Sequence, residues 1–220
     1  MGINQIIFSE QNQNLGQIGG GAWLTDPALW PKDPKTGKLM MPLLTMTSSF
    51  LSIPFIPSGM ALTVFISVEK ESNIYKHSST RQFTVHQQSE MDKLSLGYSK
   101  VLLHTLAEIE LTPATLEDPI PKTYIAQQPL TSEQMEEELN DPDSGIGISK
   151  VLGRPCWLQD PLYESPRYYF ITQLLDSDIK KISPLHEGLF GGGIGYIFAD
   201  NRAKKLQEGN EAGYFLVQFS

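Results

Sequence analysis

Ala22-Trp23-Leu24-Thr25-Asp26-Pro27 and Cys156-Trp157-Leu158-Gln159-Asp160-Pro161 share a Trp-Leu-x-Asp-Pro core, and this repetition decides the fold that we expect. One or more glycines stand shortly before each copy. A second pair of matching segments follows: Gly59–Phe65 starts 36 residues after Trp23, and Gly192–Phe198 starts 35 residues after Trp157. Matching landmarks in the same order and at nearly the same separation indicate two copies of one unit, too few for a solenoid.

The sequence predicts an α+β fold, mainly antiparallel β-sheet with few short helices, in which a strand-rich half-unit is duplicated. We expect a single domain over residues 1–220, with a first half-unit at about 15–70, a connecting region at about 71–148 and a second half-unit at about 149–220. Each half would cover the apolar face of the other. Trp23 and Trp157 would then be equivalent core anchors in matching environments.

Alternation and β-branched or aromatic content predict the strands. The expected strands cover residues 41–50, 60–68, 82–87, 107–111, 168–175, 193–199 and 213–219. Residues 39–68 carry no charge over a length that could span a bilayer, but Pro42, Pro54, Pro57 and Gly59 interrupt them, so we expect strands there and no membrane span. One helix should begin at Thr131, with Gln134 completing a capping box, and a short turn should cover 202–207.

Composition narrows the class of protein. The net charge of -8, without a cluster of Lys and Arg, disfavours nucleic-acid binding. The single cysteine excludes an intramolecular disulfide and fits a reducing compartment. Because residues 1–13 lack a basic leader and a long apolar run, we expect a cytoplasmic protein.

Several motifs resemble chemical sites but fit them poorly. Gly191-Gly192-Gly193-Ile194-Gly195 lacks the third glycine of a dinucleotide fingerprint and precedes a strand, so we interpret it as a tight turn. Asp141–Gly145 resembles a calcium loop, but its glycine is misplaced, and a turn is the better interpretation. Cys156 is interpreted as a small buried hydrophobe. Asp26 and Asp160 should each hold a turn by accepting backbone hydrogen bonds. We therefore expect no catalytic residue, no metal and no cofactor.

Further motifs are similar to those of a known family. The segments Ile18-Gly19-Gly20, Trp30-Pro31, Gly37-Lys38 and Pro57-Ser58-Gly59 look like the first half of the YwqG-like family of bacterial proteins. Gly153–Gln159, Asp176-Ser177-Asp178 and the terminal Gln218-Phe219-Ser220 resemble its second half. The resemblance covers nearly the whole chain. It implies an internally duplicated α+β fold without an established enzymatic activity, and a role for some relatives as immunity proteins that neutralise bacterial toxins.

The function that we expect is therefore binding of another protein, with a basic toxin as one candidate partner, and not catalysis. The best candidates for the contact are six carboxylates within eleven residues: Glu133, Glu136, Glu137, Glu138, Asp141 and Asp143. Such a field would steer a basic partner toward the surface. A charge run of this kind is also compatible with an ordinary solvated helix and loop.

One alternative is a small-ligand-binding protein or an enzyme with a pocket between the repeats. In that case Trp23 and Trp157 would be the side chains that stack on a ligand.

Overall fold

The computed structural model describes residues 2–78, 85–162 and 166–219. Within them the dominant element is a ten-stranded sheet, with the strand order β12-β11-β10-β9-β1-β8-β2-β3-β4-β7, in which every pair is antiparallel. Its strands are β1 (Asn4–Ser9), β2 (Gly16–Ile18), β3 (Met41–Thr47), β4 (Met60–Ile66), β7 (Ser99–Thr105), β8 (Thr123–Pro129), β9 (Lys150–Val151), β10 (Tyr168–Leu175), β11 (Ile194–Asp200) and β12 (Gly213–Gln218). The expected class, mainly antiparallel β with few short helices, is confirmed.

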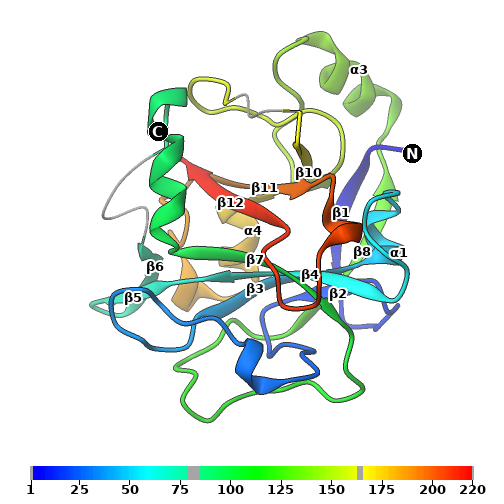
Figure 1. The fold of residues 1–220 in the computed structure, drawn as a ribbon. Coiled ribbons are helices and arrows are strands. Elements are labelled where there is room, and N and C mark those ends of the chain that lie inside the picture. The colour runs from blue at the N-terminus through cyan, green and yellow to red at the C-terminus, as the bar shows by residue number, and fades with distance from the viewer. Residues whose placement is uncertain (1, 79–84, 163–165, 220) are drawn as a thin grey trace.

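The sheet curls until its two outer strands lie side by side, so that it forms an almost closed barrel (Figure 1). The backbone N–H of Leu103 in β7 donates to the carbonyl oxygen of Asn210 at 3.0 Å, and that of Ala212 donates to the carbonyl oxygen of Val101 at 2.8 Å. The hydroxyl of Ser99 donates to the carbonyl oxygen of Phe215 at 3.0 Å. These contacts cover the outer edge of β7 around Val101 and Leu103, so this part of the edge is not open for pairing with another strand.

The remaining elements are short. A separate two-stranded sheet is formed by β5 (Val68–Glu71) and β6 (Ile74–His77). The helices are α1 (Ser48–Leu51), α3 (Ser132–Asn140) and α4 (Asp176–Ile182), and the 3-10 turns are η1 (Pro27–Leu29), η2 (Gln88–Leu96), η3 (Pro184–His186) and η4 (Ala203–Lys205). None of the helices in the described ranges has the length and apolar character needed to cross a membrane.

Strand periodicity explains how the sheet supports a core on both faces. Along β4, Leu62, Val64 and Ile66 belong to the main core inside the curled sheet. Phe65 points the other way, into a second cluster that includes Trp30, because successive side chains of a strand alternate between the faces. A third cluster, around Tyr196 and Phe198 of β11, covers another part of the outer face.

Two strand pairs carry the same irregularity. The register between β3 and β4 shifts between Pro42 and Leu44, and the register between β10 and β11 shifts between Phe170 and Thr172. A short helix follows directly in both places, α1 after β3 and α4 after β10. A β-bulge bends its strand and strengthens the local twist, which helps a sheet to curl.

One expected strand is wrong. Residues 107–111 form a loop, apart from one bridge between Leu111 and Ala22, and the side chain of Ile109 is 75% exposed. The glutamate beside it turns inward instead, because the Glu110 carboxylate receives the Gly21 N–H and the Gln17 side-chain amide. The expected strand at 82–87 lies partly outside the described residues, and Val85–Gln87 are not in a strand.

Candidate functional site

The acidic segment is held in place by the first residues of its helix. The Thr131 hydroxyl accepts the Gln134 N–H at 3.2 Å, and the Gln134 side chain accepts the Thr131 N–H at 3.0 Å, which is the capping box expected from the sequence. The helix ends at Asn140, and the Asp141 carboxylate then accepts the Asp143 N–H at 2.8 Å. This turn agrees with the interpretation of Asp141–Gly145 as a turn.

Glu138 is a correction to the expected contact surface. Its side chain is fully buried and forms an ion pair with Lys150, which is buried as well. Its two carboxylate oxygens also accept the Ile146 N–H at 2.8 Å and the Arg154 N–H at 2.7 Å. A carboxylate with these partners stabilises the fold and is not available to a partner protein. Burial lowers the pKa of the Lys150 ammonium, while the Glu138 carboxylate acts in the opposite direction.

The other five carboxylates are exposed, at Glu133, Glu136, Glu137, Asp141 and Asp143. Leu139 lies among them with 56% of its surface exposed, one turn of helix beyond Glu136. In Figure 1, α3 lies at the outer end of the molecule, away from the seam between β7 and β12. The Arg154 guanidinium fixes the end of this helix by donating to the carbonyl oxygens of Glu138 at 3.2 Å and Asp141 at 2.7 Å.

Neither Trp23 nor Trp157 is a fully buried core anchor. Both are half-buried residues in loops, whereas Trp30, at 5% exposure, is the tryptophan inside a core cluster. The Trp157 ring packs against Tyr196 and stacks on Phe198, with ring centroids 4.9 and 6.1 Å apart. Trp23 instead donates its indole N–H to the Gln17 side-chain oxygen at 3.1 Å.

Each of these two tryptophans lines a hollow. The hollow at Trp157 has a volume of about 260 Å³ and is walled by aromatic rings, with Arg154 and Asp143 also in its lining. The hollow at Trp23 has a volume of about 150 Å³ and is lined by uncharged side chains.

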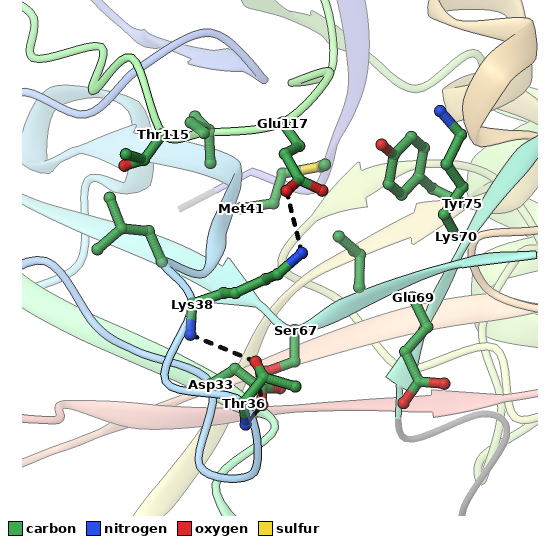
Figure 2. A pocket seen from close by; sticks show the side chains of 13 residues that line it. Asp33, Thr36, Lys38, Met41, Ser67, Glu69, Lys70, Tyr75, Thr115 and Glu117 are labelled. Carbon is green, nitrogen blue, oxygen red and sulfur yellow. Dashed lines mark hydrogen bonds and ion pairs between the residues drawn. The ribbon is translucent and has the colours of Figure 1, made fainter.

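A larger pocket, of about 400 Å³, lies between the 33–39 loop, β5 and the 115–117 segment (Figure 2). The Lys38 ammonium meets the Glu117 carboxylate at 3.0 Å, and Lys70 meets Asp118 at 3.1 Å. Both ion pairs are largely exposed and are therefore worth little energy. The lining carries both signs of charge and favours neither an anion nor a cation.

The glycine run and the cysteine behave as structural residues. Gly191 and Gly192 have φ of 65° and 82°, and the Gly192 N–H donates to the Asp176 carboxylate at 3.1 Å, so the segment is a turn. Burial raises the pKa of the Cys156 thiol, although the Lys150 charge acts against this. A thiol that stays protonated is a poor nucleophile.

The two aspartates of the repeated motif differ in their contacts. The Asp26 carboxylate accepts the Ala28 N–H at 2.8 Å, as expected, whereas Asp160 accepts the Gln218 side-chain amide with its backbone carbonyl oxygen at 3.1 Å.

The sequence did not predict two hydrogen-bonded groups of side chains. Glu110 is held by Gln17, Gly21 and Lys122, and Thr63 forms a buried hydrogen-bonded chain with Thr45 and His104. Burial alone would raise the pKa of the Glu110 carboxyl, but its hydrogen bonds outweigh this and hold the pKa below its ordinary value. For the group at Thr63, the sequence offered one signal, which is a threonine in the middle of each of two apolar strands, at Thr45 and Thr63.

Comparison with known proteins yields no family model that matches this chain and no curated protein that matches it.

Proposed function

We propose that this protein acts by binding another protein, and that the exposed face of α3 with the following turn is part of the contact. The observation that carries the proposal is the composition of this face. Leu139 is exposed in the middle of five exposed carboxylates on a helix that is fixed at both ends. Protein contacts typically have an apolar centre within a polar rim, and Leu139 would lie at that centre.

The arrangement supports recognition of a basic partner. Exposed carboxylates raise the rate of encounter with a positively charged surface, and this effect falls with added salt. The inward-facing sixth carboxylate, Glu138, keeps the helix attached to β9 through Lys150. The face is therefore presented as a preformed surface, which reduces the entropy that binding must overcome.

The family resemblance adds a candidate partner, a basic bacterial toxin, with this protein as its immunity protein. We expect the gene of an immunity protein to lie beside the gene of the toxin that it neutralises. A toxin gene next to the gene of this protein would support this part of the proposal.

The internal duplication is also part of the proposal. It is supported by the matching bulges in β3 and β10, each followed by a short helix and a long antiparallel strand. It is further supported by the central pair of strands, β1 and β8, because β1 pairs with β9 and β8 pairs with β2. The strand that precedes each half-unit, β1 for the first and β8 for the second, would then pair with a strand of the other half-unit.

The test is a measurement of association kinetics with a partner captured from the producing cells. Glu136→Lys combined with Glu137→Lys should slow association several-fold at low salt, because both side chains are exposed, and should leave the fold intact. Glu138 is left unchanged because it is buried. The matched control is Asp92→Lys combined with Glu108→Lys, which makes the same change of charge at two exposed positions elsewhere.

Equal association rates for the two double variants would remove α3 from the contact. Turnover of a small substrate by the purified protein would defeat the proposal as a whole.

A further inference from the structure

A row of polar side chains crosses the outer face of the sheet beside Trp23. Tyr124 of β8 stands opposite Gln17 of β2, Gln17 stands opposite Thr45 of β3, and Thr45 stands opposite Thr63 of β4. His104 of β7 continues the row diagonally. Thr45, Thr63 and His104 are at most 2% exposed. Polar groups buried this deeply in a sheet need an explanation, since an apolar residue would fit a pleated core at lower cost.

The hydrogen bonds in this row run in one direction. The His104 Nδ1 atom lies 2.9 Å from the carbonyl oxygen of Thr105, which can only accept, so Nδ1 carries a proton. Burial lowers the pKa of His104, so the ring is neutral and its Nε2 atom is an acceptor. The Thr63 hydroxyl therefore donates to Nε2 at 2.7 Å.

The direction of that bond fixes the next one. Because the proton of the Thr63 hydroxyl is used, its oxygen accepts the proton of the Thr45 hydroxyl at 2.9 Å. Thr45 is thereby left with acceptor capacity and no proton to give. Chains of this kind polarise their members, which makes the terminal oxygen a better acceptor.

Thr45 lines the hollow of about 150 Å³ at Trp23, together with uncharged neighbours. Trp23 and Tyr124 contribute aromatic surface to it, and Asn12 and Asn14 form its polar rim. Gln17 is held by Glu110 at 2.7 Å and in turn holds the Trp23 indole N–H at 3.1 Å, so the aromatic ring is fixed in position. None of these lining residues carries a formal charge.

The opposite part of the sheet shows what such a row can bind. Gln173 of β10 stands opposite Tyr196 of β11, as Thr45 stands opposite Thr63, and Gln218 of β12 lies diagonally beyond. There the polar side chains bind a loop of the chain itself. Gln173 accepts the Cys156 N–H at 2.8 Å, Tyr196 donates to the Cys156 carbonyl oxygen, and Gln218 accepts the Leu158 N–H at 3.2 Å. Beside Trp23, Gln17 of the corresponding row likewise binds the chain, through the Gly19 carbonyl oxygen and the Trp23 indole N–H, both at 3.1 Å, whereas Thr45 of that row lines the hollow.

We propose that the Trp23 hollow is a binding site for a single uncharged sugar unit, stacked on Trp23 with one of its hydroxyls donated to Thr45. The polar rim of Asn12 and Asn14 is exposed and offers amides to further hydroxyls. A carboxylate or phosphate finds no cation in the lining, and an ammonium finds no carboxylate. An aromatic wall with a few oriented polar groups is the usual composition of a small-molecule site. This site is separate from the acidic face of α3 and does not depend on the protein-binding proposal.

The experiment is saturation-transfer difference NMR with the full-length protein and a panel of free sugars at millimolar concentration: glucose, galactose, mannose, N-acetylglucosamine and ribose. At least one sugar should receive saturation from the native protein. Thr45→Val keeps the shape but removes the acceptor, and it should reduce binding at least tenfold, as should Trp23→Ala. Thr45→Ser should retain binding, and so should Trp157→Ala, the matched control at the other repeated tryptophan.

The proposal is overturned if no sugar in the panel binds the native protein, or if Thr45→Val and Trp23→Ala both bind as the native protein does. Preferential binding of uracil or adenine, run in parallel, would also contradict it, because the ligand would then be a heterocyclic base. Should Trp23→Ala fail to fold, the comparison of Thr45→Val with Thr45→Ser decides the question.

Discussion

Single carboxylates decide how the acidic segment and the Trp23 loop are held. Glu138 and Glu110 stand in stretches whose patterns place them on the solvent side, yet both turn inward and accept backbone N–H groups. Periodicity cannot anticipate this, because it assigns charged residues to water and does not know where unpaired backbone donors lie. Each of these two residues binds a glycine-containing segment that leads into one of the repeated Trp-Leu motifs.

Removal of the buried ion pair gives the first prediction. Glu138→Ala should destabilise the fold by about 3 to 5 kcal/mol, because it leaves the Lys150 ammonium buried without a counter-charge. The measurement is urea unfolding, with Glu137→Ala as the control at the adjacent exposed position. Replacing both partners by apolar residues, Glu138→Leu with Lys150→Met, should recover only the part of the loss that comes from the unpaired ammonium, because the Ile146 and Arg154 N–H groups still lose their acceptor. Equal midpoints for Glu138→Ala and Glu137→Ala would contradict the burial of this pair.

The second prediction concerns pH. Burial lowers the pKa of His186 to about 4, whereas an unfolded histidine titrates near its ordinary value of 6.5. As the pH falls below that ordinary value, the unfolded state binds a proton that the folded state does not, so stability is lost on acidification. Between pH 7 and pH 5 this single group should cost about 2 kcal/mol.

The check is the pH dependence of unfolding in the native protein and in His186→Gln. The variant should lose less stability between these two pH values, since its side chain does not titrate. Parallel curves for the two proteins would show that His186 titrates normally in the folded state. His77, whose pKa burial lowers to about 3, remains in both proteins and contributes equally.

At the scale of elements, three strands in the last third of the chain were predicted from their own pattern, whereas the alternating residues 107–111 form a loop. The strand at 168–175 matches β10 at both ends, and 193–199 and 213–219 match β11 and β12 within a residue. β7 was not expected, and neither were the two central strands, β1 and β8. Both contain glutamine or asparagine at their ends, and each is stabilised by pairing with the other strand over six residues rather than by its own composition.

The sequence predicts the start of α3 but not the polar row beside Trp23. The cap of α3 follows from local chemistry, because Thr131 and Gln134 are three residues apart and bind each other's backbone. The row from Tyr124 to His104 draws on five strands that are distant in sequence, so only the folded sheet brings it together. The sequence singles out Thr45 and Trp23, but it does not indicate the hydrogen bonds that link Thr45 through Thr63 to His104.

The third prediction is at this scale. Thr131→Ala should destabilise α3 by about 1 kcal/mol, because the Gln134 N–H loses its acceptor at the start of the helix. Thr131→Ser keeps the oxygen and should retain most of the stability. The measurement is the denaturant midpoint of the three proteins, and indistinguishable midpoints would mean that the capping box contributes nothing.

At the scale of the whole molecule, the curled sheet separates the proposed contact from the seam. The seam is formed by backbone hydrogen bonds between β7 and residues 209–212, just before β12, and α3 lies away from it (Figure 1). The Glu138 ion pair and the Arg154 hydrogen bonds hold α3 from its other side. Closure of this kind removes exposed strand edges and with them a route to non-specific association.

Closure is also testable by hydrogen exchange. The amide protons of Leu103 and Ala212 donate across the seam at 3.0 and 2.8 Å. They should be protected to the same degree as amides in the middle of β4, because opening the seam requires the sheet to uncurl. Exchange of both amides within the dead time of the experiment would show that the barrel is open in solution.

The central claim is that the exposed face of α3 contacts another protein, and site-specific photo-crosslinking in the producing cells tests it most directly. A photoreactive residue replaces Leu139 in one variant and Ile109 in the other, since both side chains are exposed apolar residues, at 56% and 75%. The account predicts a discrete adduct with one other protein from position 139 and none from position 109. No adduct from position 139, or the same products from both positions, would contradict it.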